Sequence, residues 1–559
     1  MKKNRLIALA AVFLLLALII LIRLFELQVI HYDFYIKKAE QQRTRIIPLS
    51  ADRGDILDRN GRILAASLDT FSVYVNPRKF TSAEVLAKLL DEPVGPFDKR
   101  KLFAWVKRKI DKSLAEKIKK AGIPAVYLLG EKKRVYPKGH LASQVLGFVG
   151  LDNEGLSGIE LSLEKYLKGK EGRIVTESDP MGYELLVAKD RNQSEVTPGM
   201  IVTLTLDESI QYLAEKVIAD TIKQFGATKG QIIVMDLKTG EILALAGKPD
   251  FDPNQYAKFD PRSWRSGAVD VYEPGSTFKV ITAAAGLDQA VVNFDTKLKT
   301  LDSIELGGKT IKNSHQIKWE RSYLTLSEML ERSINTGAVQ VALKLGPERF
   351  YKKIRDFGFG ERLSVDLPGE SAGLLKEPRH WYKPDIGMMS FGQTLAVTPV
   401  QLLAAIGSLA NGGRRLKPIL VKRIESPDGS FVRTNSTEML NHTVSERTAE
   451  EAKQLMENVV LYGTGRRTRM SRYRTGGKTG TAQKSVPGGG YYKDRFIASY
   501  VGFAPFDNPR LCALVIVDDP KASIWGESVA GPAFKVVVEE TLRYLNVPPD
   551  IMYNTANKP

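Results

Sequence analysis

The sequence Pro274-Gly275-Ser276-Thr277-Phe278-Lys279 lies where a loop gives way to an apolar stretch. Proline and glycine end the loop, so we expect a helix to begin at Ser276 and to continue to Gln289. A serine in the first turn of a helix lies beside free backbone N–H groups and the positive end of the helix dipole. Because residues three apart share one face of a helix, Lys279 is expected one turn below Ser276. A serine hydroxyl needs a nearby base, so this spacing favours a serine nucleophile that is activated by a lysine.

A lysine can act as that base only when it is neutral, and burial or a second cation nearby lowers its pKa. The Ser-x-x-Lys spacing alone is a weak signal, because Ser162-Leu163-Glu164-Lys165 has it too. That copy lies within a helical pattern among charged residues, which favours a salt-bridged surface. Other residues must decide between the two copies.

Ser333-Ile334-Asn335 is the only Ser-x-Asn in the sequence. Its side chains offer a hydroxyl that could relay a proton and an amide that could bind a substrate. The alternative is structural, since serine and asparagine both favour helix caps and turns.

Lys-Thr-Gly occurs twice in the sequence. Lys238-Thr239-Gly240 joins two strand-like segments, so we interpret it as a hairpin turn. Lys478-Thr479-Gly480 follows Gly476-Gly477 and leads into Thr481-Ala482-Gln483 at a strand edge, where glycines let a substrate approach the backbone. The serine motif, the Ser-x-Asn motif and the second Lys-Thr-Gly motif form an ordered set, which argues against coincidence.

The apolar pattern around these motifs predicts an α+β fold for residues 226–545. A hairpin of Gln231–Asp236 and Glu241–Ala246 opens this region, and strands at its other end favour an antiparallel sheet whose first and last strands meet. The expected helices are Ser276–Gln289, Leu326–Leu345, Pro399–Ala410, Thr448–Tyr462 and Ala533–Leu545, and the expected later strands are Arg474–Gln483, Phe496–Phe503 and Leu511–Val517.

Residues 46–220 form a separate region with a mixed, loop-rich pattern. We expect strands at Ile63–Ala65, Phe71–Val75 and Val202–Leu206, and helices at Lys101–Ala121, Ile159–Leu167 and Ser209–Phe225. Residues 546–559 are expected to be a C-terminal tail.

The start of the chain predicts a membrane anchor. Leu6–Ile22 has no polar side chain, and a helix of this length covers about 25 Å of a hydrocarbon core of about 30 Å. Lys2, Lys3 and Arg5 come before it and favour a cytoplasmic N-terminus. A cleaved signal peptide is the alternative, but no small-residue cut site follows. We therefore expect residues 1–45 to be the tail, anchor and juxtamembrane segment of a single-pass inner-membrane protein whose bulk lies outside the cytoplasm.

The composition narrows the class of partner. The chain has 559 residues and a net charge of +17, which suggests an anionic partner such as a lipid surface, an acidic polymer or nucleic acid. No compact Lys/Arg block or zinc-finger spacing supports nucleic acid. The single cysteine, Cys512, excludes an intrachain disulfide and a cysteine metal cluster. Neither a metal nor a cofactor is expected.

The ordered set resembles the active-site motifs of penicillin-binding proteins and class A β-lactamases. Over nearly its whole length the chain resembles class B penicillin-binding proteins. The motifs that carry this resemblance are Arg53–Ala65, Arg134–Pro137, Gly155–Glu160, Phe391–Gln393, Thr398–Gln401, Asn411–Gly413 and Val501–Pro505. The short tail, the chain length and the form of Arg53–Ala65 look more like the cell-division type than the elongation type. The resemblance implies a transmembrane helix, an N-terminal pedestal of the dimerisation type at 46–220 and a transpeptidase domain at 226–545.

The resemblance also implies catalytic roles. Ser276 attacks the D-alanyl-D-alanine carbonyl of one peptidoglycan stem peptide and forms an acyl-enzyme, with Lys279 as the base. Ser333 relays a proton with the help of the Lys478 ammonium. Which of Lys279 and the Lys478–Ser333 pair takes each proton stays open.

Substrate binding is implied for the neighbouring residues. Asn335 holds the substrate amide, and backbone N–H groups of Ser276 and Thr481 form the oxyanion hole. The terminal carboxylate of the substrate binds beside Lys478. The expected substrate-binding residues follow this lysine on the same strand and are Thr479, Gly480 and Thr481.

Expected partners are stem peptides, nascent glycan, a polytopic membrane glycosyltransferase and other wall-synthesis or division proteins, with β-lactam antibiotics as covalent inhibitors. No Glu-Asp-x-x-Phe run typical of a glycosyltransferase domain occurs, so we expect cross-linking without glycan polymerisation. The alternatives are an elongation-type transpeptidase, a β-lactamase, a penicillin-sensing receptor and a non-catalytic wall scaffold. A Ser-His-Asp hydrolase lacks support, because the five histidines stand in no motif.

Overall fold

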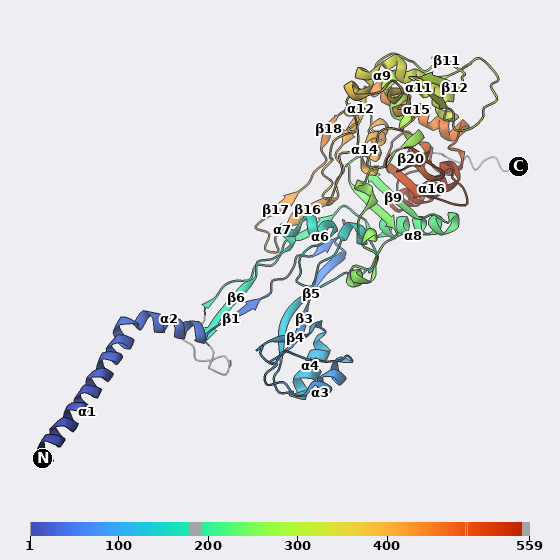
Figure 1. Ribbon diagram of the computed structural model, residues 1–559. Coiled ribbons are helices and arrows are strands. Elements are labelled where there is room, and N and C mark those ends of the chain that lie inside the picture. Colours follow the sequence, from blue (N-terminus) through green and yellow to red (C-terminus); the bar gives the residue numbers. More distant parts are fainter. Residues whose placement is uncertain (1, 178–191, 487, 489, 551–559) are drawn as a thin grey trace. The chain divides into compact units, whose positions relative to one another are not determined.

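The computed structural model describes residues 2–177, 192–486, 488 and 490–550 (Figure 1). The chain divides into two compact units. Unit 1 comprises Met1–Asp52, Phe71–Lys132 and Gly169–Pro198, and unit 2 comprises Arg53–Thr70, Lys133–Lys168 and Gly199–Pro559. The units alternate along the sequence, whereas the expected regions 46–220 and 226–545 follow one another.

Unit 1 begins with helix α1, Lys2–Phe25, which continues into the π-helical turn η1, Glu26–Ile30. Within the described residues, Lys3–Ile30 is the one helical stretch long and apolar enough to cross a membrane. After it come α2 (Tyr32–Arg43) and β1 (Thr44–Leu49), and β1 lies in an antiparallel sheet with β6 (Gly172–Glu177) and β7 (Asn192–Gln193).

Residues 71–132 of unit 1 form a small lobe of strands and two helices. The end of β3 (Ile63–Val75) pairs with β4 (Ala104–Ile110) and with β5 (Val126–Val135). Helices α3 (Ala83–Leu90) and α4 (Lys112–Ala121) pack on the strands around a shared apolar core. This core covers one face of the lobe's sheet.

The expected helix Lys101–Ala121 is wrong in its first half. Ala104–Ile110 forms a strand, and the helix begins only after Asp111. Ala104, Val106 and Ile110 contribute to the lobe's core, so pairing with β3 and a period of two override the helical spacing. The many lysines in this stretch fit either structure. The separately expected strands at 63–65 and 71–75 are parts of the single strand β3.

Unit 2 is built on a five-stranded antiparallel sheet of order β10-β9-β21-β20-β19. Its strands are β9 (Lys229–Asp236), β10 (Ile242–Lys248), β19 (Gly476–Ser485), β20 (Tyr491–Ala504) and β21 (Leu511–Asp518). The early strand β9 pairs with the last strand β21, which confirms the predicted meeting of the two ends of the region. Helices α8 (Glu208–Phe225) and α16 (Gly526–Tyr544) pack on one face of this sheet.

The other face of the sheet carries a helical layer. Its members are α9 (Lys279–Asp288), α10 (Leu326–Glu331), α11 (Asn335–Leu345), α12 (Pro347–Asp356), α13 (Lys383–Met389), α14 (Pro399–Ala410) and α15 (Glu446–Tyr462). Short strands β11 (Leu298–Lys299), β12 (Ser303–Leu306), β13 (Lys309–Lys312), β14 (Tyr323–Leu324), β15 (Arg414–Leu416) and β18 (Met439–His442) lie between them. A single apolar core joins this layer to the sheet.

Two expected helices are interrupted at the positions that matter for the site. Leu326–Leu345 is two helices, because Arg332–Ile334 breaks the run and Ser333 adopts a φ of 56°. Ser276 lies in a 3-10 turn, Gly275–Phe278, that continues directly into α9. The helix expected at 159–167 is likewise divided into α6 (Gly158–Ser162) and α7 (Glu164–Leu167).

The Arg53–Ala65 motif is part of a second sheet. In this sheet β2 (Ile56–Leu57) lies between β3 and β8 (Ile201–Leu204), and the sheet continues from β8 to β16 (Val421–Glu425) and β17 (Val432–Thr434). The short helix α5 is formed by Ser143–Leu146. The buried Glu160 carboxylate forms ion pairs with Arg53 (2.5 Å) and Arg134 (2.6 Å), and the Tyr136 hydroxyl donates to it at 3.2 Å. Three of the predicted motifs therefore meet in one buried polar cluster.

Candidate active site

The turn before α9 brings Ser276 and Lys279 together. The Lys279 amine lies 3.1 Å from the Ser276 hydroxyl, as expected for neighbours on one helical face. Gly275 has a φ of 57°, and a Cβ there would lie 2.9 Å from the Cβ of Ala482 on β19. Glycine is needed at this position because the turn is pressed against the strand.

The break between α10 and α11 places Ser333 between two lysines. Lys279 Nζ lies 2.6 Å from the Ser333 carbonyl oxygen and 3.1 Å from its hydroxyl. Lys478 Nζ lies 3.1 Å from the same hydroxyl. Without the left-handed backbone at Ser333 the helix would run on, so the break is what delivers this hydroxyl to both amines.

Both lysines are fully buried, and this sets their protonation. The pKa of Lys279 lies well below its ordinary value because burial penalises the charged form and the Lys478 charge opposes it. Burial lowers the pKa of Lys478 to about 7, while the Glu527 carboxylate opposes this shift. The neighbouring Lys478 charge disfavours an ammonium at Lys279, whereas the Glu527 carboxylate favours one at Lys478, so we interpret Lys279 as the neutral amine and Lys478 as the cation.

Each lysine amine has three oxygen neighbours. Those of Lys279 are Ser276 Oγ and the carbonyl and hydroxyl oxygens of Ser333, and those of Lys478 are Ser333 Oγ, Thr479 O at 3.1 Å and Thr479 Oγ1 at 3.2 Å. A neutral amine has two N–H donors and one lone pair, so a neutral Lys279 can donate to both oxygens of Ser333 and accept the proton of Ser276. An ammonium at Lys478 can donate to all three of its neighbours.

Strand β19 forms the other wall of the site. Thr479 is buried, and its hydroxyl lies 2.9 Å from that of Thr464, so it supports Lys478 from behind. Thr481 faces the open side, and its hydroxyl accepts a bond of 3.3 Å from the Gly526 N–H at the start of α16. A Cβ on Gly480 would lie 2.3 Å from the Ser499 hydroxyl, so only glycine fits between β19 and β20 there.

A groove of about 480 Å³ opens over Ser276. Asn335 lines it and donates from its amide to the Lys312 carbonyl at 2.9 Å. The groove is lined by Gly275, Ser276, Lys309, Thr310, Ile311, Lys312, Asn313, Ser314, Asn335, Met388, Phe391, Gln393, Thr481, Ala482, Gln483, Phe496, Ile524 and Trp525. No carboxylate is among these lining residues. An arriving peptide therefore meets hydroxyls, amides and cations.

A larger cavity of about 680 Å³ lies beside Gln483 and Glu273. It contains none of Ser276, Lys279 and Lys478. Chemistry rather than size therefore identifies the smaller groove as the candidate site.

Glu273 lies outside the groove, but it contacts residues next to the site, and the sequence reasoning did not single it out. Its Oε1 accepts from the Thr394 N–H at 3.0 Å and from the Tyr491 hydroxyl at 3.1 Å, and burial raises the pKa of its carboxyl. Thr394 has a φ of 63°, which is rare for a β-branched residue, and the bond that its N–H donates to Glu273 supports this conformation. The only sequence signal was a carboxylate directly before Pro274-Gly275, and its partners are distant in sequence.

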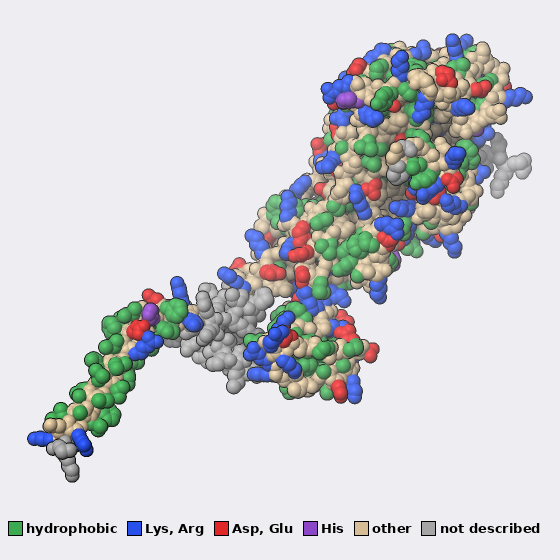
Figure 2. Space-filling model, viewed as in Figure 1, with side chains coloured by type: hydrophobic (Ala, Val, Ile, Leu, Met, Phe, Trp, Pro, Cys, Tyr) green, Lys and Arg blue, Asp and Glu red, His purple; other side chains and the backbone are tan. Residues whose placement is uncertain are grey.

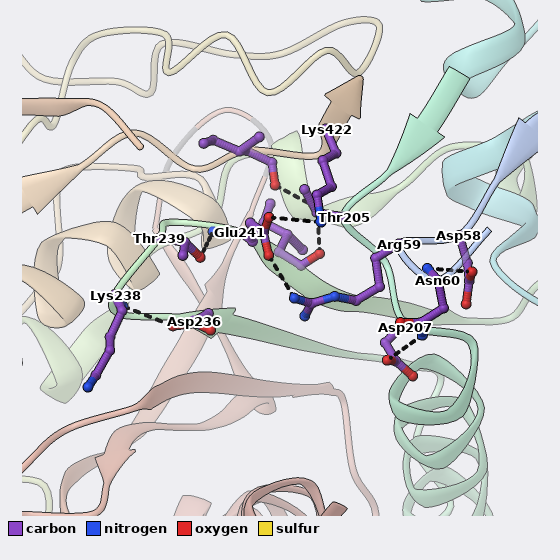
Figure 3. A network of polar contacts seen from close by, with 12 residues as sticks. Asp58, Arg59, Asn60, Thr205, Asp207, Asp236, Lys238, Thr239, Glu241 and Lys422 are labelled. Carbon is purple, nitrogen blue, oxygen red and sulfur yellow. Dashed lines mark hydrogen bonds and ion pairs between the residues drawn. The ribbon is translucent and has the colours of Figure 1, made fainter. Parts of the chain in front are cut away.

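The other Lys-Thr-Gly motif and the other Ser-x-x-Lys motif lie in different environments. In the hairpin turn of Lys238-Thr239-Gly240, the Lys238 N–H donates to Asp236 at 2.9 Å, and Glu241, which follows the turn, forms an ion pair of 3.0 Å with Arg59 (Figure 3). In the Ser162–Lys165 motif, the Lys165 amine lies over the ring of Tyr166. These contacts involve none of the residues around Ser276.

Comparison with known proteins places the chain in a family. Residues 230–539 match the penicillin binding protein transpeptidase domain, and residues 48–204 match the penicillin-binding protein dimerisation domain. Stage V sporulation protein D of Bacillus subtilis is 34% identical over 91% of this chain and 81% of that protein. The probable peptidoglycan D,D-transpeptidase PenA of Neisseria meningitidis is 33% identical over 94% and 90%, and the peptidoglycan D,D-transpeptidase FtsI of Escherichia coli is 29% identical over 96% and 91%.

Solved structures give the same result. The crystal structure of penicillin binding protein 3 from Mycobacterium tuberculosis in complex with aztreonam is 28% identical, covers 90% of this chain and 98% of its own, and has a TM-score of 0.71. The match of a family model to more than half of the chain, the relatives and the ordered site motifs all agree. The chain therefore belongs to the class B penicillin-binding proteins, the family of peptidoglycan D,D-transpeptidases.

Proposed function

We propose that this chain cross-links peptidoglycan stem peptides through an acyl-enzyme on Ser276. The observation that carries the proposal is the buried Lys279 amine, whose Nζ lies 3.1 Å from the Ser276 hydroxyl oxygen. Lys279 takes the hydroxyl proton while Ser276 Oγ attacks the carbonyl of the penultimate D-alanine. The negative charge that develops on the carbonyl oxygen is stabilised by the backbone N–H groups of Ser276 and Thr481, each worth about 3–4 kcal/mol.

The leaving D-alanine needs a proton on its nitrogen. Ser333 accepts hydrogen bonds from both lysines, so its own proton is free to go to that nitrogen. Lys478 then replaces the proton of Ser333. This route assigns acylation to Lys279 and leaving-group protonation to the Lys478–Ser333 pair.

Substrate recognition follows from the charges of the groove. The terminal carboxylate binds near Lys478 and the Thr481 hydroxyl, with Thr479 and Gly480 shaping the strand behind them. The Asn335 amide holds the peptide backbone on the opposite wall. Because β-lactams place a carboxylate and a reactive carbonyl in similar positions, we expect them to acylate Ser276.

The acyl-enzyme is then attacked by an amine of a second stem peptide. Since no carboxylate lines the groove within the described residues, nothing there activates water, and this favours a transpeptidase over a β-lactamase. A penicillin acyl-enzyme should therefore be long-lived. Penicillin hydrolysis at tens of turnovers per second would contradict this.

The nucleophile assignment is tested by covalent labelling with a fluorescent penicillin. Ser276→Ala should abolish labelling, because the attacking oxygen is removed. Ser162→Ala, in the other Ser-x-x-Lys copy, should leave labelling unchanged. Labelling that survives Ser276→Ala would refute the assignment.

We further propose that α1 anchors the chain in the inner membrane with a cytoplasmic N-terminus. The apolar segment and the preceding Lys2, Lys3 and Arg5 support this topology. Protease added to spheroplasts should digest all but the anchor and tail. Full protection of the bulk would contradict the orientation.

The chain is proposed to work in septal wall synthesis beside a polytopic glycosyltransferase that supplies glycan. The similarity to FtsI and the absence of a glycosyltransferase motif support this role. The test supplies lipid-linked disaccharide-pentapeptide to the purified chain, alone and with such a polymerase. Cross-linked polymer is expected only in the second case, and long glycan made by this chain alone would defeat the claim.

A further inference from the structure

The lobe of unit 1 carries aromatic side chains on the face of its sheet that the helices leave uncovered. Along each of three neighbouring strands, core residues alternate with an outward aromatic one: Val73-Tyr74-Val75, Ala104-Trp105-Val106 and Val126-Tyr127-Leu128. Tyr74 stacks on Tyr127 with ring centroids 5.2 Å apart, and its ring centroid lies 6.1 Å from that of Trp105. The outward face of an antiparallel sheet is ordinarily polar.

The loop before β4 extends this face. Phe103 lies 4.8 Å from both Tyr74 and Trp105 between ring centroids. Leu102 is 62% exposed, Phe103 43%, Tyr127 39% and Trp105 38%. We call the set Tyr74, Leu102, Phe103, Trp105 and Tyr127 the aromatic patch. It is too apolar to be explained as an ordinary solvated surface.

Basic side chains border the aromatic patch. Arg78, Lys79, Arg100 and Lys101 are exposed, and Arg78 donates to the Arg100 carbonyl at 3.0 Å, which brings the two basic pairs to one end of the lobe. The Arg108 guanidinium lies 5.1 Å from the Trp105 ring centroid. Residues 71–132 contain 14 Lys and Arg against 7 Asp and Glu, a net charge of +7. Figure 2 shows Lys and Arg side chains beside hydrophobic ones on this lobe.

This combination fits a lipid surface. Trp and Tyr favour the interface between hydrocarbon and water, where the ring is buried and the N–H or O–H stays wet. Exposed Leu102 and Phe103 can enter the acyl boundary, while Lys101 and the solvent-exposed Arg100, whose pairing with Asp98 is a surface ion pair, meet anionic head groups. A sugar-binding face would need free amide or carboxylate side chains between its rings, and the carboxylate beside the aromatic patch, Glu131, is already engaged by Arg108 and by the Ser72 hydroxyl.

We infer that the aromatic patch docks on the anionic lipid surface of the membrane that holds α1. This inference rests on the proposed anchoring, because the anchor keeps the lobe at high local concentration over that surface. Docking would give the chain a second hold on the membrane.

The test uses the full chain in lipid nanodiscs and reads the quenching of Trp105 fluorescence by lipids brominated in their acyl chains. Trp105 is one of five tryptophans, so its share is the difference between the wild type and Trp105→Phe. We expect this share to be quenched in discs of phosphatidylglycerol. It should fall about fivefold in discs of phosphatidylcholine or in the double variant Arg100→Glu/Lys101→Glu.

The matched control is Lys117→Glu/Lys120→Glu, which makes the same charge change on exposed positions of α4, on the covered side of the sheet. It should quench like the wild type. An unquenched Trp105 in anionic discs would overturn the inference, and this is the result expected if the patch instead binds an acidic protein. Equal loss of Trp105 quenching in both double variants would also overturn it. Co-elution of the chain with the disc reports on the anchor separately, and penicillin labelling of Ser276 reports on the proposed activity.

Discussion

The hairpin turn at Lys238 and strand β19 at Lys478 share the tripeptide Lys-Thr-Gly, yet their lysines end in opposite environments. Lys238 is exposed at a turn, whereas Lys478 is fully buried beside Ser333. Two glycines come before the second copy and a strand follows it, so this copy lies within β19, the edge strand of the five-stranded sheet. Burial, and not the tripeptide, converts a lysine into a group with a pKa of about 7.

The largest effect is expected from removing Lys478, with the removal of Lys238 as its control. Lys478→Ala should lower the rate constant of acylation by penicillin about 10²- to 10⁴-fold, because Ser333 loses its proton source and the substrate carboxylate loses its counter-ion. Lys238→Ala should change it less than about twofold, as expected for an exposed side chain. Stopped-flow labelling measures both constants. Equal losses would show that the two copies are not distinguished by burial.

The second expectation concerns pH. Acylation requires neutral Lys279, so the rate should rise with pH through the lowered pKa of Lys279, and it should fall as Lys478 loses its charge above about 7. A bell-shaped profile of the acylation constant is the result. In Lys478→Arg the guanidinium stays charged, so the alkaline fall should disappear, whereas Lys238→Arg should keep the wild-type profile. A flat wild-type profile between pH 5 and 9 would contradict the assignment.

The two glycines of the copies should respond differently to a methyl group. In Gly480→Ala the Cβ would lie 2.3 Å from the Ser499 hydroxyl, so β19 must shift and acylation should fall about tenfold. In Gly240→Ala the Cβ would lie 2.4 Å from the Lys417 carbonyl oxygen and the left-handed φ of 79° alone costs about 1–3 kcal/mol of folding free energy, but this turn is remote from Ser276, so the acylation constant should stay unchanged. Thermal unfolding and labelling rates, measured on the same preparations, separate the two outcomes.

The smallest effect should come from Glu273 and its partners. Tyr491, the first residue of β20, bonds to Glu273, and we call the paired strands β19 and β20 the β19–β20 arm. Tyr491→Phe removes this hydrogen bond of about 1 kcal/mol, so acylation should slow about fivefold as the arm loosens. Glu273→Ala should be worse, because the bond to Thr394 is lost as well. Tyr212→Phe, an exposed tyrosine on α8, is the matched control and should match the wild type. No change in Tyr491→Phe would show that the arm is held by packing alone.

Local pattern was enough for much of the fold. The apolar run at 6–22, the alternation in the strands of the unit 2 sheet and the helical spacing of 399–410 each lie within one element, so the residues themselves carry the signal. The ordered motifs likewise predicted which side chains would meet, and the structure brings Ser276, Lys279, Ser333 and Lys478 together.

Features that depend on distant contacts could not be predicted. Nothing in Glu331-Arg332-Ser333 forbids a helix, and the break there exists because Ser333 is held by lysines from two other elements. The strand β4 forms because β3 pairs with it, although its lysines also fit a helix. Glu273 and Tyr491 are 218 residues apart, so no local pattern could join them.

The pairing of β9 with β21 has a consequence for the making of this protein. On the proposed topology, a chain that is exported while it is translated would present Ser276 well before Leu511–Asp518 has crossed the bilayer. Until β21 pairs with β9, strands β20 and β19 cannot join the sheet, and Lys478 on β19 cannot become buried. We therefore expect an unfinished chain to carry an unreactive serine. Nascent chains would then escape both antibiotic and premature acylation until export is complete.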